Sequence, residues 1–389
     1  MNNKETILSF LEIETGASKS YGSNKFCFEN EERAKIDYDD SHQKSWTVKE
    51  SGETNPPKAS IALVADALNL QKQNIPPLFR YFLDGSRRTY KVDDVAYNNK
   101  IYPIVAGQIG VACCQRLDLD NFKKNIIEMH NVISMPSMAN ASGQKSNLYF
   151  NNLLTKVNNL DKLKKMNIKF NKILPYSKSK DDDKYENLAV AKIQDEMIEL
   201  EKIVVSDLTT KKLLNTNAFL IKDGSLEYKV MRTGDFRELA KIKNNYRHVV
   251  GISKQFNPDL MVDKRGKPNA SLLADLKLYH RTPAIKHHTG MVGDVNFSIW
   301  YIRIRDVKYS ASPFEGIIKV EKILVTDDEN ENGLDSSEIN NISAHLINER
   351  NPVCYGSDKR WANHLYPVHL TERYIKSRYL SDSYYLNLF

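Results

Sequence analysis

The sequence predicts an α/β protein in which helices flank a mixed β-sheet. Two apolar runs, at 78–83 and 218–221, each lead into an Asp-Gly-Ser triplet, as buried strands that reach a turn do. Between them, residues 187–205 have helical spacing, with an apolar stripe along one side. At 389 residues the chain is long enough for a sizeable core, as one elaborated domain or as two.

The composition is that of an ordinary soluble globular protein, with 41% hydrophobic and 27% charged residues. No apolar run approaches the roughly 20 residues that a membrane helix needs, and the first residues lack the order of a signal peptide. We therefore expect a cytoplasmic protein with no membrane partner. The four cysteines contain no CxxC pair, which predicts reduced thiols rather than disulfides or structural zinc. The formal charge of +7 weakly favours a polyanionic partner.

We expect residues 1–77 to form an N-terminal arm that precedes the main domain at 78–389. The arm contains two helix candidates, at 6–14 and 60–72, and a polar segment between them. Pro76 and Pro77 end the arm, because proline cannot continue a helix.

Within the main domain, residues 100–116 have the β-branched enrichment of one or two strands. Residues from about 117 to 187 are rich in Lys, Asn and Asp, with helical spacing at 121–133 and 148–166, which predicts a helical insertion. Further strands are expected at 246–254, 296–305 and 315–325, and a helix at about 365–380. The loop expected at 279–291 contains His287 and His288, which have no carboxylate at ligand spacing and are left outside the predicted site.

The two triplets place Asp84 and Asp223 at expected strand ends. Hydrolysis of a phosphodiester requires stabilisation of charge on the attacking and leaving oxygens, which two divalent ions about 3.5–4 Å apart provide. Mg²⁺ and Mn²⁺ prefer carboxylate oxygens, so two strand-end aspartates in a chain without a Cys/His cluster fit such ions. Since Asp-Gly is also a common turn dipeptide, a pair of simple turns is the alternative interpretation.

A third carboxylate is expected from the helix at 187–205. Glu199 points away from the apolar stripe, whereas Glu196 and Glu201 border it. Glu201 is the preferred candidate because it lies near the helix end that approaches the strand. The alternative is that all three residues belong to a solvated helix face.

These motifs, in this order, resemble the NurA nucleases: FLDGSRR, a Glu-bearing helix, FLIKDGSL, VVGISK, a strand with arginines and a terminal helix after Tyr-Pro. The resemblance spans roughly 78–379 and rests on short motifs. It implies an RNase H-like core related to the Piwi domain, and degradation of DNA with a divalent metal, typically Mn²⁺. It further implies a homodimer that docks on a hexameric HerA-type ATPase, in DNA end processing or in defence against invading DNA.

The resemblance also implies roles for individual residues. Asp84, Asp223 and a glutamate of the 196–201 helix would hold the metal, Mn²⁺ or Mg²⁺. Lys254 would contact a phosphate as a point charge. Three arginines, Arg87, Arg303 and Arg305, are candidates for DNA contacts, although surface arginines have the same pattern.

The sequence departs from the family near its C-terminus. The family carries a metal-site histidine in a helix after Tyr-Pro, and Arg373 and Tyr374 stand about where it is expected. His369 lies one turn earlier and His364 precedes the Tyr-Pro. We expect His369 to complete the metal site, with a surface or hydrogen-bonded histidine as the alternative.

Two other functions fit the same sequence. One is a non-catalytic nucleic-acid-binding or assembly subunit, which the departure at the terminal histidine favours. The other is a Piwi-like guide-dependent nuclease, which the short N-terminal arm disfavours. The chain contains no GxxxxGK[ST] motif, so ATP-driven translocation is expected to come from a partner.

Overall fold

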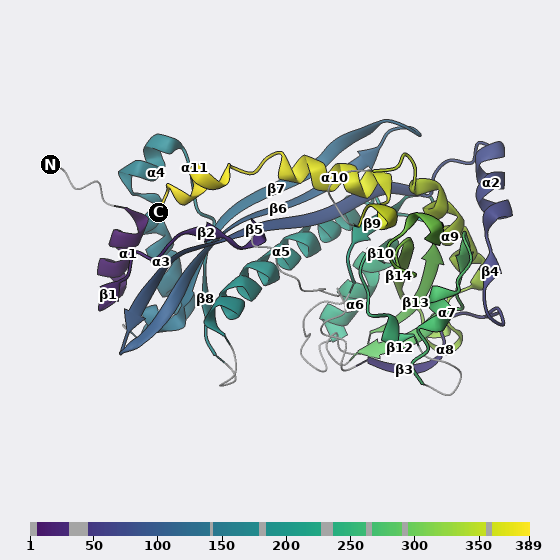
Figure 1. Cartoon of the computed structure of the whole chain (residues 1–389), viewed down its shortest axis with the longest axis horizontal. Coiled ribbons are helices and arrows are strands. Elements are labelled where there is room, and N and C mark those ends of the chain that lie inside the picture. Colours follow the sequence, from purple (N-terminus) through teal and green to yellow (C-terminus); the bar gives the residue numbers. More distant parts are fainter. Residues whose placement is uncertain are drawn as a thin grey trace.

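The computed structural model describes residues 6–30, 46–140, 143–178, 184–226, 236–261, 267–289, 295–354 and 360–389. The described strands form a 14-stranded sheet with the path β3-β12-β13-β14-β10-β9-β5-β6-β7-β8 (Figure 1). Along this path lie β3 (Trp46–Ser51), β12 (Ile285–Thr289), β13 (Asn296–Arg303), β14 (Ile317–Ile323), β10 (Val249–Ser253), β9 (Phe219–Asp223), β5 (Phe79–Tyr97), β6 (Lys100–Arg116), β7 (Phe122–Pro136) and β8 (Lys172–Tyr176). The short strands off the path are β1 (Lys19–Ser20), β2 (Phe26–Cys27), β4 (Ile61–Ala62) and β11 (His280–Arg281).

Helices cover both faces of this sheet. They are α1 (Ile7–Thr15), α2 (Val64–Lys72), α3 (Ser146–Asn158), α4 (Asp161–Met166), α5 (Tyr185–Thr210), α6 (Phe236–Tyr246), α7 (Ser271–Ala274), α8 (Asp327–Asn332), α9 (Ser336–Glu349), α10 (Tyr366–Lys376) and α11 (Asp382–Leu386). Short 3-10 turns lie at Phe28–Asn30, Ser137–Ala139, Pro258–Leu260, Val307–Tyr309 and Trp361–Asn363.

The middle of the sheet confirms the predicted fold class. Strands β5, β6 and β7 are antiparallel neighbours, β9 is parallel to β5, and β10 is parallel to β9. The next strand, β14, is antiparallel to β10. A mixed sheet of this order, flanked by helices, is consistent with an RNase H-like arrangement.

Two helices cover opposite faces of β5 and β6, as Figure 1 shows for α5 below and α10 above these strands. A Cβ atom added to Gly85 of β5 would meet Glu201 and Met197 of α5. A Cβ atom added to Gly110 of β6 would meet Ile375 of α10. Because neighbouring strand residues face opposite ways, Asp84 lies on the α10 face and Gly85 on the α5 face.

The first Asp-Gly-Ser triplet is not at a strand end, contrary to the sequence prediction. β5 continues to Tyr97, and Asp84, Gly85 and Ser86 pair with residues 110–112 of β6. Pairing along the long β5–β6 hairpin keeps this triplet extended. The second triplet does follow a strand end: β9 stops at Asp223, and Gly224 has a φ of 83°, which favours glycine.

The predicted helix at 121–133 is wrong, because Phe122–Pro136 forms strand β7. β7 pairs with β6 along most of its length. The β-branched residues of the segment favour an extended strand over a helix. The predicted helical spacing at 148–166 is confirmed by α3 and α4. The helical part of the insertion therefore begins only after β7.

The N-terminal segment is part of the sheet rather than a separate arm. Its two predicted helices are confirmed as α1 and α2, but β1 and β2 pair with β5, β3 pairs with β12, and β4 pairs with β11. His287 and His288, expected in a loop, lie in β12.

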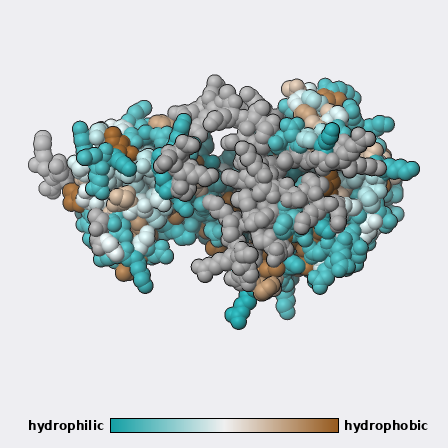
Figure 2. Space-filling model, turned by 90° about the horizontal axis from the view of Figure 1, so that it is seen from below, coloured by the Kyte–Doolittle hydropathy of each residue, from teal (hydrophilic) through white to brown (hydrophobic). Residues whose placement is uncertain are grey.

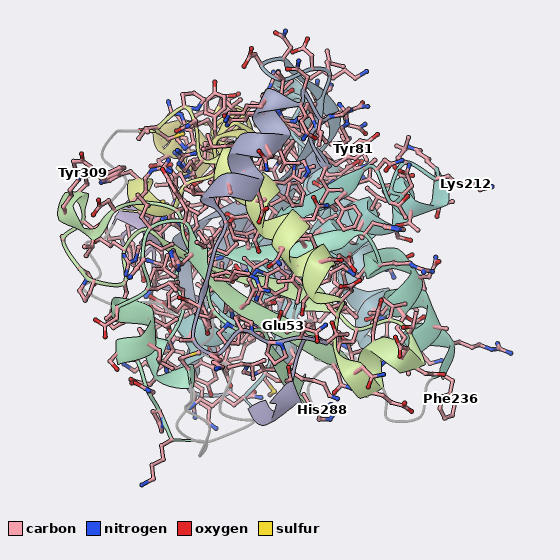
Figure 3. All side chains as sticks on the ribbon, turned by 90° about the vertical axis from the view of Figure 1, so that its right-hand side faces the viewer. Glu53, Tyr81, Lys212, Phe236, His288 and Tyr309 are labelled. Atoms are coloured by element: carbon pink, nitrogen blue, oxygen red, sulfur yellow. The ribbon has the colours of Figure 1, made fainter. Side chains whose placement is uncertain are left out.

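Buried ionic contacts tie this N-terminal segment to the sheet. The Arg281 guanidinium donates to both oxygens of Glu53 at 2.9 and 2.8 Å, and the Ala284 N–H donates to Glu53 at 2.7 Å. Glu53 is labelled near the centre of the view in Figure 3, and Arg281 and Glu53 are both 1% exposed.

None of the described helices is both long and apolar enough to cross a bilayer. Figure 2 shows hydrophilic residues over much of the described part of one face, with apolar residues in small separate areas. Their scattered distribution is ordinary for a protein surface.

Substitution Glu53→Gln is expected to lower the free energy of unfolding by about 3–5 kcal/mol, because it leaves the buried Arg281 charge unpaired. The control Asp207→Asn breaks the exposed Lys211–Asp207 ion pair and is expected to cost less than about 1 kcal/mol. Urea unfolding of both variants measures the difference. Equal losses would show that Glu53 does not anchor the segment.

Candidate active site

Three carboxylates and one lysine gather on the α10 face of the sheet. Leu83 of β5 pairs with Lys222 of β9, so the next residues, Asp84 and Asp223, lie side by side. Lys254 follows the end of β10, the strand beyond β9, and its Nζ lies 2.9 Å from Asp223 Oδ2. The same Nζ lies 3.6 Å from Glu372 Oε2 on α10. We call Asp84, Asp223, Lys254 and Glu372 the carboxylate centre.

Asp84 is the buried member of this group. Asp84 is 4% exposed, and its Oδ2 atom has no hydrogen-bond partner among the described residues. Burial raises the pKa of Asp84 well above its usual range, and Asp223 raises this pKa further, while Lys254 opposes both. The charged form of Asp84 is therefore costly unless a cation lies beside it.

Lys254 balances part of this negative charge. Burial alone would lower its pKa, but Asp223, Glu372 and Asp84 outweigh burial and raise it, so the lysine is charged. The Asn363 amide donates to the Lys254 carbonyl at 3.0 Å and to the Ile317 carbonyl. These contacts fix the backbone that carries the ammonium.

Glu372 was not predicted from the sequence. Lys376 donates to it at 2.6 Å from one turn later on α10, and Arg360 lies 3.5 Å from it. Burial would raise the pKa of Glu372, but Lys254, Lys376 and Arg360 outweigh burial and lower it to about 2. The sequence does carry a signal for Glu372, because this glutamate lies near Thr371 and Ile375 on the buried side of the terminal helix. The sequence prediction considered only histidines in this helix.

Glu201 lies on the other face of the sheet, which corrects its assignment to the same metal as Asp84. It is buried on α5 against Gly85, and Lys222 Nζ lies 3.0 Å from Glu201 Oε2. Burial raises the pKa of Glu201, while Lys222 lowers it. A buried lysine pairs with this carboxylate, so Glu201 is satisfied without a metal.

Glu196 also lies away from the carboxylate centre. Its carboxylate is 2.7 Å from Lys172 of β8 and 3.9 Å from His130 of β7. These strands lie beyond β6, on the side of the sheet away from β9. Glu196 therefore stabilises the packing of α5 on the sheet.

The turn after Asp223 is held by a buried glutamate. Glu321 of β14 accepts hydrogen bonds from the Ser225 hydroxyl at 2.9 Å and from the Leu226 N–H at 2.8 Å. Lys319 lies 2.7 Å from the same carboxylate. The serine of the second triplet thus fixes the turn that carries Asp223.

Two of the three predicted DNA-contacting arginines are buried, which corrects that assignment. Arg303 is 2% and Arg305 8% exposed. Arg305 donates to the carbonyls of Ile304 and Arg350. Arg303 donates to backbone carbonyls of the neighbouring turns, those of Leu273, Ala274, Leu276, Pro313 and Glu315. Both guanidiniums are therefore engaged by backbone carbonyls of the protein itself.

Arg87 is partly exposed but has protein partners. Its Nη1 lies 2.8 Å from Glu29, and its Nε donates to Gln194 at 2.6 Å. Arg87 follows Gly85 by two residues, so it lies on the α5 face and not on the face of Asp84.

His369 lies in a different cluster from the one predicted, and the expectation of a chain without a Cys/His cluster is wrong. The possible ligand atoms of Cys354, His364 and His369 all lie within 4.8 Å of one another, which is a possible metal-binding group. The two imidazole rings are stacked, with centroids 5.0 Å apart. Among the described residues the carboxylates form no group of three that meets this distance. We call Cys354, His364 and His369 the Cys-His cluster.

Substitution Glu372→Gln is expected to lower the free energy of unfolding at pH 7 by up to about 3 kcal/mol, because the folded-state pKa lies below the ordinary 4.5. The stabilisation is complete above pH 4.5 and is lost as the pH falls towards about 2. Urea unfolding between pH 7 and pH 3 measures it, with Glu199→Gln as the exposed control. A difference that stays constant across this range would contradict the ion-pair account.

A cavity of about 580 Å³ lies between α2, α9 and the start of α10, and no residue of the carboxylate centre lines it. It is therefore not the predicted site. Comparison of the sequence with protein-family models and with curated proteins finds no match.

Proposed function

We propose that this chain is a metal-dependent deoxyribonuclease with its reaction centre at Asp84, Asp223, Glu372 and Lys254. One observation supports this most strongly. Asp84 is buried beside Asp223, with one oxygen that has no partner among the described residues. A divalent cation bound there would offset the burial and the repulsion from Asp223 that raise the pKa of Asp84.

The donors suit Mn²⁺ or Mg²⁺. Asp84, Asp223 and Glu372 offer only carboxylate oxygens, which these hard cations prefer, and no thiolate or imidazole belongs to the centre. When bound, such an ion supplies charge stabilisation at the attacking and leaving oxygens of a phosphodiester.

The protein side chains have distinct roles in this proposal. Asp84 and Asp223 hold the cation from two adjacent strands, whose pairing fixes the spacing of the carboxylates. Glu372 closes the centre from α10. Lys254, charged and 6% exposed, neutralises Asp223 and Glu372 and is placed to contact a phosphate that approaches Asp223. Asp223 is the more accessible aspartate, with an 18% exposed side chain.

Three features support DNA as the substrate. The chain carries a formal charge of +7, which attracts phosphates. The sheet order is consistent with an RNase H-like arrangement. The order of the motifs resembles that of the NurA nucleases, which act as dimers with a HerA-type ATPase. DNA end processing and antiviral defence both follow from such an activity.

A second candidate, a non-catalytic nucleic-acid-binding subunit, is favoured by one observation. Lys254 already contacts two of the three carboxylates. Among the described residues, the oxygens of the three carboxylates do not all lie within 4.8 Å of one another. A subunit of this kind would bind DNA but would not degrade it, whichever divalent metal ion is added.

Substitutions Asp84→Asn and Asp223→Asn are each expected to reduce Mn²⁺-dependent DNA degradation by more than the 10–100-fold that loss of an outer-shell partner costs. Release of fluorescent nucleotides from labelled DNA measures the rate. DNA binding and the unfolding midpoint, measured in parallel, separate a catalytic loss from a folding loss. Wild-type rates in both variants would refute the assignment.

The position of the third carboxylate is tested by a matched pair. Glu372→Gln is expected to reduce the rate far more than Glu201→Gln, because only Glu372 shares a face with Asp84. Glu199→Gln, on the exposed side of α5, serves as the control for helix substitutions. The opposite ranking would place the reaction centre on the α5 face.

Co-expression with a HerA-like hexameric ATPase is expected to give a complex that degrades DNA faster in the presence of ATP, because translocation feeds substrate to the nuclease. Light scattering of the chain alone and of the complex measures the stoichiometry, with a dimer of this chain expected. Failure to co-purify, or degradation that ATP does not change, would count against this partner.

A further inference from the structure

We propose that the Cys-His cluster, Cys354, His364 and His369, binds a second metal ion of the zinc class, separate from the carboxylate centre. Their possible ligand atoms lie within 4.8 Å of one another, close enough to share one ion. Cys354 is 9% and His364 1% exposed, and His369 is half-buried. The Nδ1 atom of His369 is buried and has no hydrogen-bond partner among the described residues.

The donor chemistry separates this site from the carboxylate centre. One thiolate and two imidazoles are the ligands that Zn²⁺ binds in a tetrahedral arrangement, at about 2.3 Å for sulfur and 2.0–2.1 Å for nitrogen. Carboxylate oxygens favour Mg²⁺ or Mn²⁺ instead. Three protein ligands leave one position of a tetrahedral ion for water.

The three ligands come from three consecutive pieces of the fold. Cys354 follows α9, His364 follows the 3-10 turn at Trp361–Asn363, and His369 lies in α10. An ion held by all three would tie the segment after α9 to the beginning of α10. Among the described residues between α9 and α10, only Trp361–Asn363 forms a regular turn, so such a tie would fix where α10 begins.

The site also borders the carboxylate centre. Glu372 lies on α10 three residues after His369, which places the two side chains on neighbouring positions of the same helix face. Asn363, next to His364, donates to the carbonyl of Lys254. A metal in the Cys-His cluster would thereby position both Glu372 and Lys254 without touching the substrate.

The position of Cys354 fits a metal ligand. The hydrogen bond that Cys354 makes with the described residues is a long one, from Sγ to the Pro352 carbonyl at 3.8 Å. Burial raises the pKa of the Cys354 thiol, and Arg305 and Lys254 partly oppose this increase.

The test uses the full chain, prepared without metal and titrated with Co²⁺, which reports thiolate ligation and tetrahedral geometry by absorption. We expect one Co²⁺ per chain with a sulfur-to-cobalt charge-transfer band, and displacement by Zn²⁺. Cys354→Ser and His369→Gln are expected to abolish the band or weaken Co²⁺ binding by at least about 100-fold. Circular dichroism of each variant shows whether it has folded.

Two controls distinguish the possible outcomes. Cys27→Ser removes another buried cysteine, on β2, and is expected to keep the band. Asp84→Asn with Asp223→Asn is also expected to keep it, so failure of the proposed nuclease activity leaves this result unchanged. No charge-transfer band in the wild type, a band that survives in folded Cys354→Ser and His369→Gln, or a band lost with the aspartates would overturn the proposal.

Discussion

The placement of one ammonium group among three carboxylates is the constraint on which the rest of the site depends. Lys254 reaches Asp223 at 2.9 Å and Glu372 at 3.6 Å, so it joins the end of β10 to the end of β9 and to α10. Without a charged lysine, the buried acids of three separate elements would repel one another. Lys254 compensates Asp84 only in part, and the raised pKa of Asp84 marks the place where a further cation would be most stabilising.

The sheet explains why the acids meet. Parallel pairing of β5 with β9 sets Asp84 beside Asp223, although the two triplets differ in backbone: one is extended within a hairpin and the other is a turn. Glu321 and Ser225 hold that turn from the neighbouring strand. Sheet pairing and a buried hydrogen-bonded anchor therefore position the aspartates before any ligand binds.

The sequence predicted site residues well where the signal was local. It did not predict which face of the sheet a side chain would lie on. Apolar runs ending in Asp-Gly-Ser located both aspartates, and the resemblance at VVGISK pointed to Lys254. Helical periodicity placed Glu201 on the inner side of α5 but could not show that this side meets the face opposite Asp84. The expected strand at 296–305 carries Arg303 and Arg305, but the carbonyls that bind them lie far away in the sequence. Glu372 joins Lys254 only through tertiary packing of α10.

The most direct measurement is a crystal structure of the full chain soaked in Mn²⁺, with anomalous scattering recorded at the manganese edge. The account predicts a manganese peak bound by Asp84 and Asp223 on the α10 face. Glu372 would lie near the ion, directly or through a water molecule, and Lys254 would either move away from Asp223 or keep its contact with it. A peak at Glu201 on the α5 face, or no peak at the aspartates, would contradict it.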